Sequence, residues 1–193
     1  WMAPYDKVTL YSPCYERYFE NGIPIGTNAP GEEGWCLPAL FELQCQKTPD
    51  LAAVEFQGLT LTYNELNEKS NQVATWLRAR GGVPDQMIGI CADRSFDLVI
   101  GILGILKSGC AYVPFDASYP SDRIDYMVAE SGIKTVLIQE SFRNIFSKTP
   151  TELKALDSEW KDFEKESHSN PGVNILPHHL AYVLFTSGST GMP

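Results

Sequence analysis

Strand-like and helix-like segments alternate between residues 87 and 139, and this alternation limits the possible folds more than any other feature. Three apolar runs predict strands: MIGICA (87–92), CAYVPF (110–115) and TVLIQ (135–139). The first is nearly continuous, which is typical of strands that are covered on both faces. The segments between these runs have helical spacing. Strand–helix–strand units at this spacing predict an α/β fold of βαβ units with a largely parallel sheet.

The first connecting helix is expected from Phe96 to Lys107, with Ser95 as its N-cap. Because this helix is apolar nearly all round, it should be buried. Gly101 and Gly104 lower its intrinsic helix propensity, which predicts that a neighbouring element packs closely against them.

The pattern is also regular between Trp35 and the first of these strands. A helix that begins near Leu37 is expected to end at Pro49, and two short strands, 51–56 and 59–61, should turn at Gly58. Thr62 and Glu65 then form a capping box, T-x-x-E. The helix after it should end at Gly81 and Gly82, with a buried face of Leu66, Val73, Ala74 and Leu77.

The segments beyond the second strand are less regular. Ser121 is expected to cap a helix that Gly132 ends. The stretch 149–177 is polar and acidic, and residues 152–166 are interpreted as a solvated surface element. The adjacent His178 and His179 lack spaced Cys, Asp or Glu partners, so a loop before the last strand is favoured over a metal site.

Composition narrows the classes of protein. The chain has 193 residues and a net charge of −9, and its 15 basic residues are scattered, which disfavours nucleic acids and anionic membranes as partners. Five cysteines form no C-x-x-C pair, so neither a zinc site nor a disulfide framework is expected. No signal peptide is visible, and a reducing cytoplasm is the expected location. The longest apolar run, Leu98 to Leu106, is too short to span a bilayer.

Two parts of the chain differ in pattern. Residues 1–34 contain aromatics and prolines without a sustained period, and we interpret them as an irregular linker or the tail of a preceding domain. Residues 35–193 form the regular part. The chain begins with Trp1 and ends within a Gly/Ser/Thr loop, so we expect a fragment.

That loop, TSGSTG from Thr186 to Gly191, directly follows the strand-like run AYVLF. Glycines let several backbone N–H groups converge, and hydroxyls add donors, so the loop is a candidate phosphate site, although many such loops are plain turns. Its spacing matches neither the G-x-x-x-x-G-K-[ST] loop nor the G-x-S-x-G elbow, so neither Ser187 nor Ser189 is assigned as a nucleophile. No Lys or Arg follows Lys165, so a bound nucleotide would need Mg²⁺ or cations from elsewhere.

Three stretches in order carry a family resemblance: LTYNEL (61–66), LKSGCAYVPFDASYPSDR (106–123) and AYVLFTSGSTGMP (181–193). Together they resemble the adenylate-forming superfamily, and within it the amino-acid adenylation domains of non-ribosomal peptide synthetases. In the second stretch, Tyr112, Val113 and Phe115 are expected in the core, while Asp116 and Arg123 should fix a turn and a helix start. The chain would then be part of the N-terminal subdomain of such an enzyme, truncated at its phosphate-binding loop.

The resemblance implies ATP-dependent formation of an aminoacyl-AMP, followed by loading of a phosphopantetheine carrier domain. It implies ATP and Mg²⁺ as cofactors. The residues implied to hold the phosphates are Thr186, Ser187, Gly188, Ser189, Thr190 and Gly191. The family's amino-acid pocket, metal-binding acid and catalytic lysine would all lie downstream, so we assign no catalytic or metal-binding residue here and expect the fragment alone to be inactive. Acyl- or aryl-CoA synthetases and a truncated, non-catalytic binding module remain as alternatives.

Overall fold

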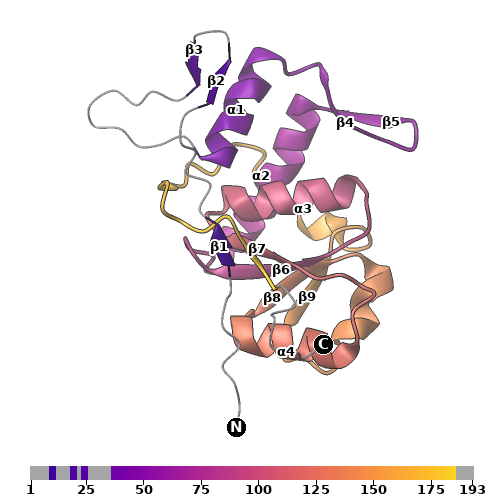
Figure 1. Cartoon of the computed structure of the whole chain (residues 1–193). Coiled ribbons are helices and arrows are strands. Elements are labelled where there is room, and N and C mark those ends of the chain that lie inside the picture. The colour runs from indigo at the N-terminus through magenta and orange to yellow at the C-terminus, as the bar shows by residue number, and fades with distance from the viewer. Residues whose placement is uncertain (1–8, 12–17, 21–22, 26–35, 186–193) are drawn as a thin grey trace.

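A six-stranded sheet forms the centre of the molecule (Figure 1). The computed structural model describes residues 9–11, 18–20, 23–25 and 36–185. Along the sheet the strand order is β1-β10-β7-β6-β8-β9. The strands are β1 (Thr9–Tyr11), β6 (Met87–Cys91), β7 (Ala111–Pro114), β8 (Thr135–Ile138), β9 (Glu152–Ala155) and β10 (Tyr182–Leu184). All neighbours pair in parallel except β1, which is antiparallel to β10, so the predicted α/β fold with a largely parallel sheet is confirmed.

Helices cover both faces of this sheet. On one face lie α2 (Tyr63–Ala79) and α3 (Phe96–Lys107), and on the other lies α4 (Ser121–Ser131) (Figure 1). The helix α1 (Leu37–Lys47) packs against α2 and α3. Two clusters of buried side chains result, one between the sheet and the α2–α3 layer and one between the sheet and α4.

The predicted close packing of α3 is confirmed at both glycines. A Cβ atom on Gly104 would lie 2.5 Å from the Cβ and Cγ1 atoms of Val73 in α2. A Cβ atom on Gly101 would lie 2.7 Å from Cδ1 of Ile90 in β6. The two glycines therefore let α3 approach α2 on one side and the sheet on the other. The Ser95 cap is also confirmed, since its Oγ accepts from Leu98 N at 3.3 Å.

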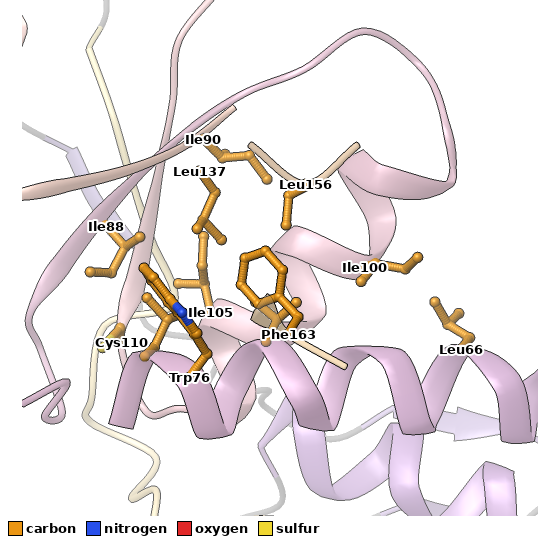
Figure 2. Packing of buried hydrophobic residues seen from close by; sticks show 12 residues of the cluster. Leu66, Trp76, Ile88, Ile90, Ile100, Ile105, Cys110, Leu137, Leu156 and Phe163 are labelled. Atoms are coloured by element: carbon orange, nitrogen blue, oxygen red, sulfur yellow. The ribbon is translucent and has the colours of Figure 1, made fainter. Parts of the chain in front are cut away.

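The capping box at the start of α2 is confirmed. The backbone N–H of Thr62 donates to Glu65 Oε2 at 2.8 Å, and the N–H of Glu65 donates to Thr62 Oγ1 at 3.2 Å. This helix follows a separate hairpin of β4 (Ala52–Phe56) and β5 (Leu59–Thr62), which turns at Gly58 as expected. The predicted inner face of α2 is buried, and Figure 2 shows Leu66 and Trp76 of this helix directed toward the cluster that contains Phe163.

The expected cap at Ser121 is wrong. Pro120 occupies the N-cap position of α4, no side chain caps the helix, and Ser121 is already its first helical residue. A proline with φ −54° leads directly into helical backbone, so the chain turns without a hydroxyl acceptor. The expected end is confirmed, because Gly132 has a left-handed φ of 64°.

The interpretation of residues 152–166 as a solvated element is also wrong. Residues 152–155 form β9, which pairs in parallel with β8, and both Leu156 and Phe163 are buried in the core. The short 3₁₀ helices η1 (Glu140–Phe146) and η2 (Trp160–Asp162) flank this strand. The charges are accommodated by pairing: Lys154 Nζ lies 2.6 Å from Asp162 Oδ2 and 3.4 Å from Glu159 Oε1.

Three short segments, 9–11, 18–20 and 23–25, are strands where irregular structure was expected. β1 adds to the edge of the sheet, while β2 (Tyr18–Glu20) and β3 (Ile23–Ile25) form an antiparallel pair. The division of the chain at residue 34 remains a prediction. Among the described residues, no helix is long and apolar enough to cross a membrane.

Candidate nucleotide site

The chain leaves β6 and β7 in opposite directions at the carboxyl edge of the sheet. β6 leads to α3 on one face, and its neighbour β7 leads to α4 on the other. In open α/β sheets, a crevice forms where the connections of adjacent strands diverge in this way, and ligands bind there. The carboxyl ends of β6 and β7 are therefore the place to look for a ligand site.

A hollow of about 370 Å³ lies at this point. Side chains of α3, α4, η1 and the strand ends form its apolar wall: Ile90, Leu98, Ile102, Phe115, Met127 and Phe142. The loops that follow the two strands supply its polar lining: Asp93, Arg94, Asp116 and Tyr119. Leu184 and Phe185, at the end of β10, complete it. A mostly apolar hollow with a few polar groups is the usual form of a small-molecule site.

The loop after β7 is held by its own polar groups, as the sequence predicted. Asp116 Oδ1 accepts from Ser118 N at 2.8 Å, which closes the turn. Hydrogen bonds from the side chain and the backbone N–H of Ser118 hold the pKa of Asp116 below its ordinary value of 3.8, so the carboxylate is charged at neutral pH. The guanidinium of Arg123 lies 4.0 Å from the ring centre of Tyr119, at the start of α4. Asp116 and Arg123 therefore shape the turn and helix start, while Val113 and Phe115 are buried and Tyr112 is half-buried.

The loop after β6 is tied to the end of β8 by Gln139. The Gln139 Oε1 accepts from Asp93 N at 2.9 Å, and its Nε2 donates to Asp97 Oδ2 at 2.9 Å and to Ser95 Oγ at 3.2 Å. Sequence reasoning missed Asp93 and Arg94, which line the hollow, and Gln139, which holds the loop that carries them. The available signal was their position, because each lies within three residues of the end of a buried strand.

The buried thiol of Cys91, which is among the residues that line the hollow, is unreactive. Burial, followed by the nearby Asp116 and Asp93 carboxylates, raises the pKa of Cys91 to about 12. The thiolate is the nucleophilic form of cysteine, so Cys91 does not act as a nucleophile at neutral pH. Within the described chain, Cys36, Cys45, Cys91 and Cys110 are free thiols and are buried, as expected of small hydrophobes.

The two adjacent histidines lie in the turn before β10. The backbone N–H of Leu176 donates to His179 Nδ1 at 3.0 Å, and the backbone N–H of His179 donates to Leu176 O at 2.9 Å. The ring centres of His178 and His179 are 4.7 Å apart in an edge-to-face arrangement. Across the part of the chain that the structure describes, no three His, Cys, Asp or Glu side chains form a group that could hold a metal ion.

β10 reaches the same edge of the sheet as the hollow. Tyr182 pairs in parallel with Tyr112 of β7, and Tyr112 N donates to Ala181 O at 3.0 Å. The six predicted phosphate-binding residues, from Thr186 to Gly191, lie outside the described residues. They follow Phe185 directly in the chain, and Phe185 lines the hollow. The structure therefore describes the strand that leads to the predicted loop but not the loop itself.

This fold and this edge define a class of α/β protein with a ligand site at the carboxyl ends of parallel strands. The family model described as "AMP-binding enzyme" matches residues 41–193. The chain belongs to the family of AMP-binding enzymes.

Comparison with known proteins extends this result. The chain is 43% identical over 172 residues to polyketide synthase PksN of Bacillus subtilis (strain 168), covering 87% of this chain and 3% of that protein. It is 46% identical over 163 residues to bacitracin synthase 2 of Bacillus licheniformis, covering 84% of this chain and 6% of that protein. The chain thus spans a small part of the length of these relatives.

A solved structure confirms the fold. The crystal structure of the non-ribosomal peptide synthetase FmoA3 is 32% identical and has a TM-score of 0.73, with 78% of this chain and 16% of that chain covered. The resemblance to the adenylation domains of such synthetases is confirmed at the level of family and fold.

Proposed function

We propose that this chain contributes the N-terminal part of an adenylation domain that activates an amino acid with ATP. The observation that carries the proposal is the position of β10, which ends beside the hollow at the carboxyl edge and leads directly into TSGSTG. The product would be an aminoacyl-AMP, which a phosphopantetheine-bearing carrier domain would then receive. Free thiols at four buried cysteines are consistent with a reducing compartment such as the cytoplasm.

The donors of the proposed loop suit the charge that must be stabilised. When a carboxylate attacks the α-phosphorus of ATP, charge grows on the departing β- and γ-phosphates. Preorganised N–H and O–H donors stabilise such charge in the transition state. We assign this role to the backbone of Thr186–Gly191 and foremost to the hydroxyls of Thr186, Ser189 and Thr190. Mg²⁺ would supply further positive charge against the phosphates, and we assign none of its ligands to residues of this chain.

Isosteric removal of two hydroxyls tests this assignment. In the intact protein, Thr186→Val and Thr190→Val should each slow amino-acid-dependent ATP–pyrophosphate exchange by a factor on the order of 10², the loss typical of one transition-state donor. Thr60→Val is the matched control, because Thr60 is exposed on β5 in the separate hairpin. Exchange that stays at the wild-type rate in both loop variants would refute the assignment.

The choice of acid in the same assay tests the substrate class. Exchange stimulated by an amino acid supports the proposal, whereas exchange stimulated by fatty or aryl acids together with dependence on free CoA would assign the chain to an acyl- or aryl-CoA synthetase. We expect the 193 residues alone to show no exchange, and measurable exchange by them would contradict that expectation.

A further inference from the structure

Lys107, the last residue of α3, is a buried cation. Its side chain is 0% exposed. The Nζ atom lies 2.8 Å from Glu42 Oε1, 2.7 Å from Asn67 Oδ1, 2.8 Å from Asn71 Oδ1 and 3.4 Å from Asn170 Oδ1. Burying an ammonium group is costly unless its protons find acceptors. Burial lowers the pKa of Lys107 below its ordinary value, and the hydrogen bond to Glu42 and its negative charge partly oppose this shift. The three short contacts match the three protons of the ammonium group.

The oxygen atoms around Lys107 come from three separate parts of the chain. Glu42 belongs to α1, Asn67 and Asn71 to α2, and Asn170 to the segment that runs from η2 toward β10. Asn67 directly follows LTYNEL in α2, and Lys107 lies in the second family stretch, so the helix that begins within the first stretch meets the second stretch at this cation.

The two asparagines of α2 bind both Lys107 and the segment that contains His168 and Asn170. Each presents its amide oxygen to Lys107 and its amide nitrogen to the segment: Asn71 Nδ2 donates to His168 O at 2.7 Å and to Asn170 Oδ1 at 2.9 Å. Asn67 Nδ2 donates to Asn170 Oδ1 at 3.1 Å. Lys107 therefore fixes both amides in the orientation that holds residues 168–170.

The same segment continues into β10 and is held again at its far end. A Cβ atom on Gly109 would lie 3.2 Å from Cγ1 of Val173, so the segment passes closely over the turn that follows Lys107. Leu180 N then donates to Asp85 Oδ1 at 2.7 Å, and Tyr112 N donates to Ala181 O at 3.0 Å. Residues 168–181 are thus anchored at Lys107 and at the start of β10.

We propose that Lys107 is a positioning residue, which, through Asn67, Asn71 and Asn170, holds the segment that sets the start of β10. Its consequence for catalysis rests on the proposed function, because β10 leads into the loop assigned to the phosphates. One buried ammonium group thereby links α1, α2 and α3 to the segment that leads into the third family stretch.

Hydrogen exchange on the full chain tests the positioning independently of activity. Asn170→Ala removes the contacts of the Asn170 side chain with Asn67, Asn71 and Lys107. It leaves the bonds of Lys107 to Glu42, Asn67 and Asn71, and the bond of Asn71 to His168 O, in place. We expect amides of residues 180–184 to exchange about tenfold faster, the size expected for loss of the hydrogen bonds to the Asn170 side chain, while β6 amides keep their protection. Asn174→Ala is the matched control, because Asn174 is exposed in the same segment.

Lys107→Met supplies the second variant, because methionine keeps the apolar stem and removes the charge. We expect the same local acceleration at residues 180–184 together with faster exchange in α1 and α2. Unchanged exchange at residues 180–184 in Asn170→Ala overturns the proposal. Acceleration spread equally over β6 and β10 in that variant also overturns it, because it indicates general destabilisation.

A split in kinetic constants completes the test in the intact protein. Asn170→Ala should raise the KM for ATP severalfold and leave the KM for the amino acid unchanged, whereas a purely structural effect would lower the active fraction and change neither KM. If wild-type protein shows no ATP–pyrophosphate exchange, the proposed function fails, and the hydrogen-exchange result still decides whether Lys107 positions β10.

Discussion

At the scale of single residues, the helix caps predicted from the sequence are present where a hydroxyl or carboxylate oxygen accepts a hydrogen bond from a free backbone N–H. Thr62, Glu65 and Ser95 cap their helices as their spacing predicts. The rule failed at Ser121 because the preceding proline sets the backbone that begins α4. The ion pair between Lys154 and Asp162 could not be predicted from the sequence, because it depends on β9, which has no recognisable strand pattern.

The carboxylate of Asp162 makes the free energy of unfolding depend on pH in the acid range. Hydrogen bonds from Lys154 and then Lys165 lower the pKa of Asp162 from 3.8 to about 2. A carboxylate with a depressed folded-state pKa stabilises the fold above its unfolded pKa, and this contribution disappears as the pH falls through the folded pKa. We therefore expect Asp162→Asn to flatten the fall in the free energy of unfolding between pH 3.8 and about 2.

The measurement is a series of urea unfolding curves over that pH range. Asp50→Asn is the control, because Asp50 is exposed before β4. Parallel pH curves for wild type and Asp162→Asn would show that the ion pairs with Lys154 and Lys165 do not form in solution.

At the scale of elements, the contact between α2 and α3 depends on a missing side chain. Gly104→Ala gains helix propensity of about 1 kcal/mol but places a methyl group 2.5 Å from Val73 atoms. Overpacking of this kind costs about 1–3 kcal/mol, so we expect a net loss of stability despite the better helix former. Denaturant unfolding with a constant m-value would measure it.

A double-mutant cycle isolates that contact. Val73→Ala removes Cγ1, one of the two Val73 atoms that the new methyl group of Gly104→Ala would meet at 2.5 Å, and keeps the other, Cβ. The clash is therefore partly relieved, and the double variant should be less destabilised than the sum of the two single variants, by about 0.5–3 kcal/mol. Strict additivity would mean that α3 shifts away from α2 instead of clashing with Val73.

The sequence identified strands and helices best where the apolar pattern was continuous. The strands β6, β7 and β8 and the helix α3 have the predicted type and nearly the predicted bounds. β9 was missed because its four residues include Glu152 and Lys154, whose charges are satisfied only by partners far along the chain or in the next turn. A charged strand of this kind has no local signature that distinguishes it from a solvated segment.

At the scale of the whole molecule, the buried thiols should report global unfolding. Cys36, Cys45, Cys91 and Cys110 are between 1% and 8% exposed. Alkylation needs an accessible thiolate, so these four should resist iodoacetamide at about pH 8 in the folded protein and react together when urea unfolds it. Peptide mass spectrometry measures each site, and Cys91 labelled without urea would contradict the burial and raised pKa described for it.

The candidate site was only partly predictable, because its lining depends on how the whole chain folds. The sequence located the TSGSTG stretch and the strand before it, because both are contiguous. The hollow is formed by side chains from loops and helices that the topology brings together, among them Arg94, Asp116 and Phe142. Which strands become neighbours is decided by the whole sheet, so no local pattern could assemble that lining.

The strand order also has a consequence for biosynthesis. β10 pairs with β7 although Tyr112 and Tyr182 are 70 residues apart in the chain. At about 5–20 residues per second, a ribosome needs roughly 4 to 14 s to make the intervening residues. During that interval one edge of β7 has no partner from β10 and is open to pairing with another nascent chain. The strand that leads to the proposed phosphate loop is thus also the strand that covers this edge of β7 once it has been made.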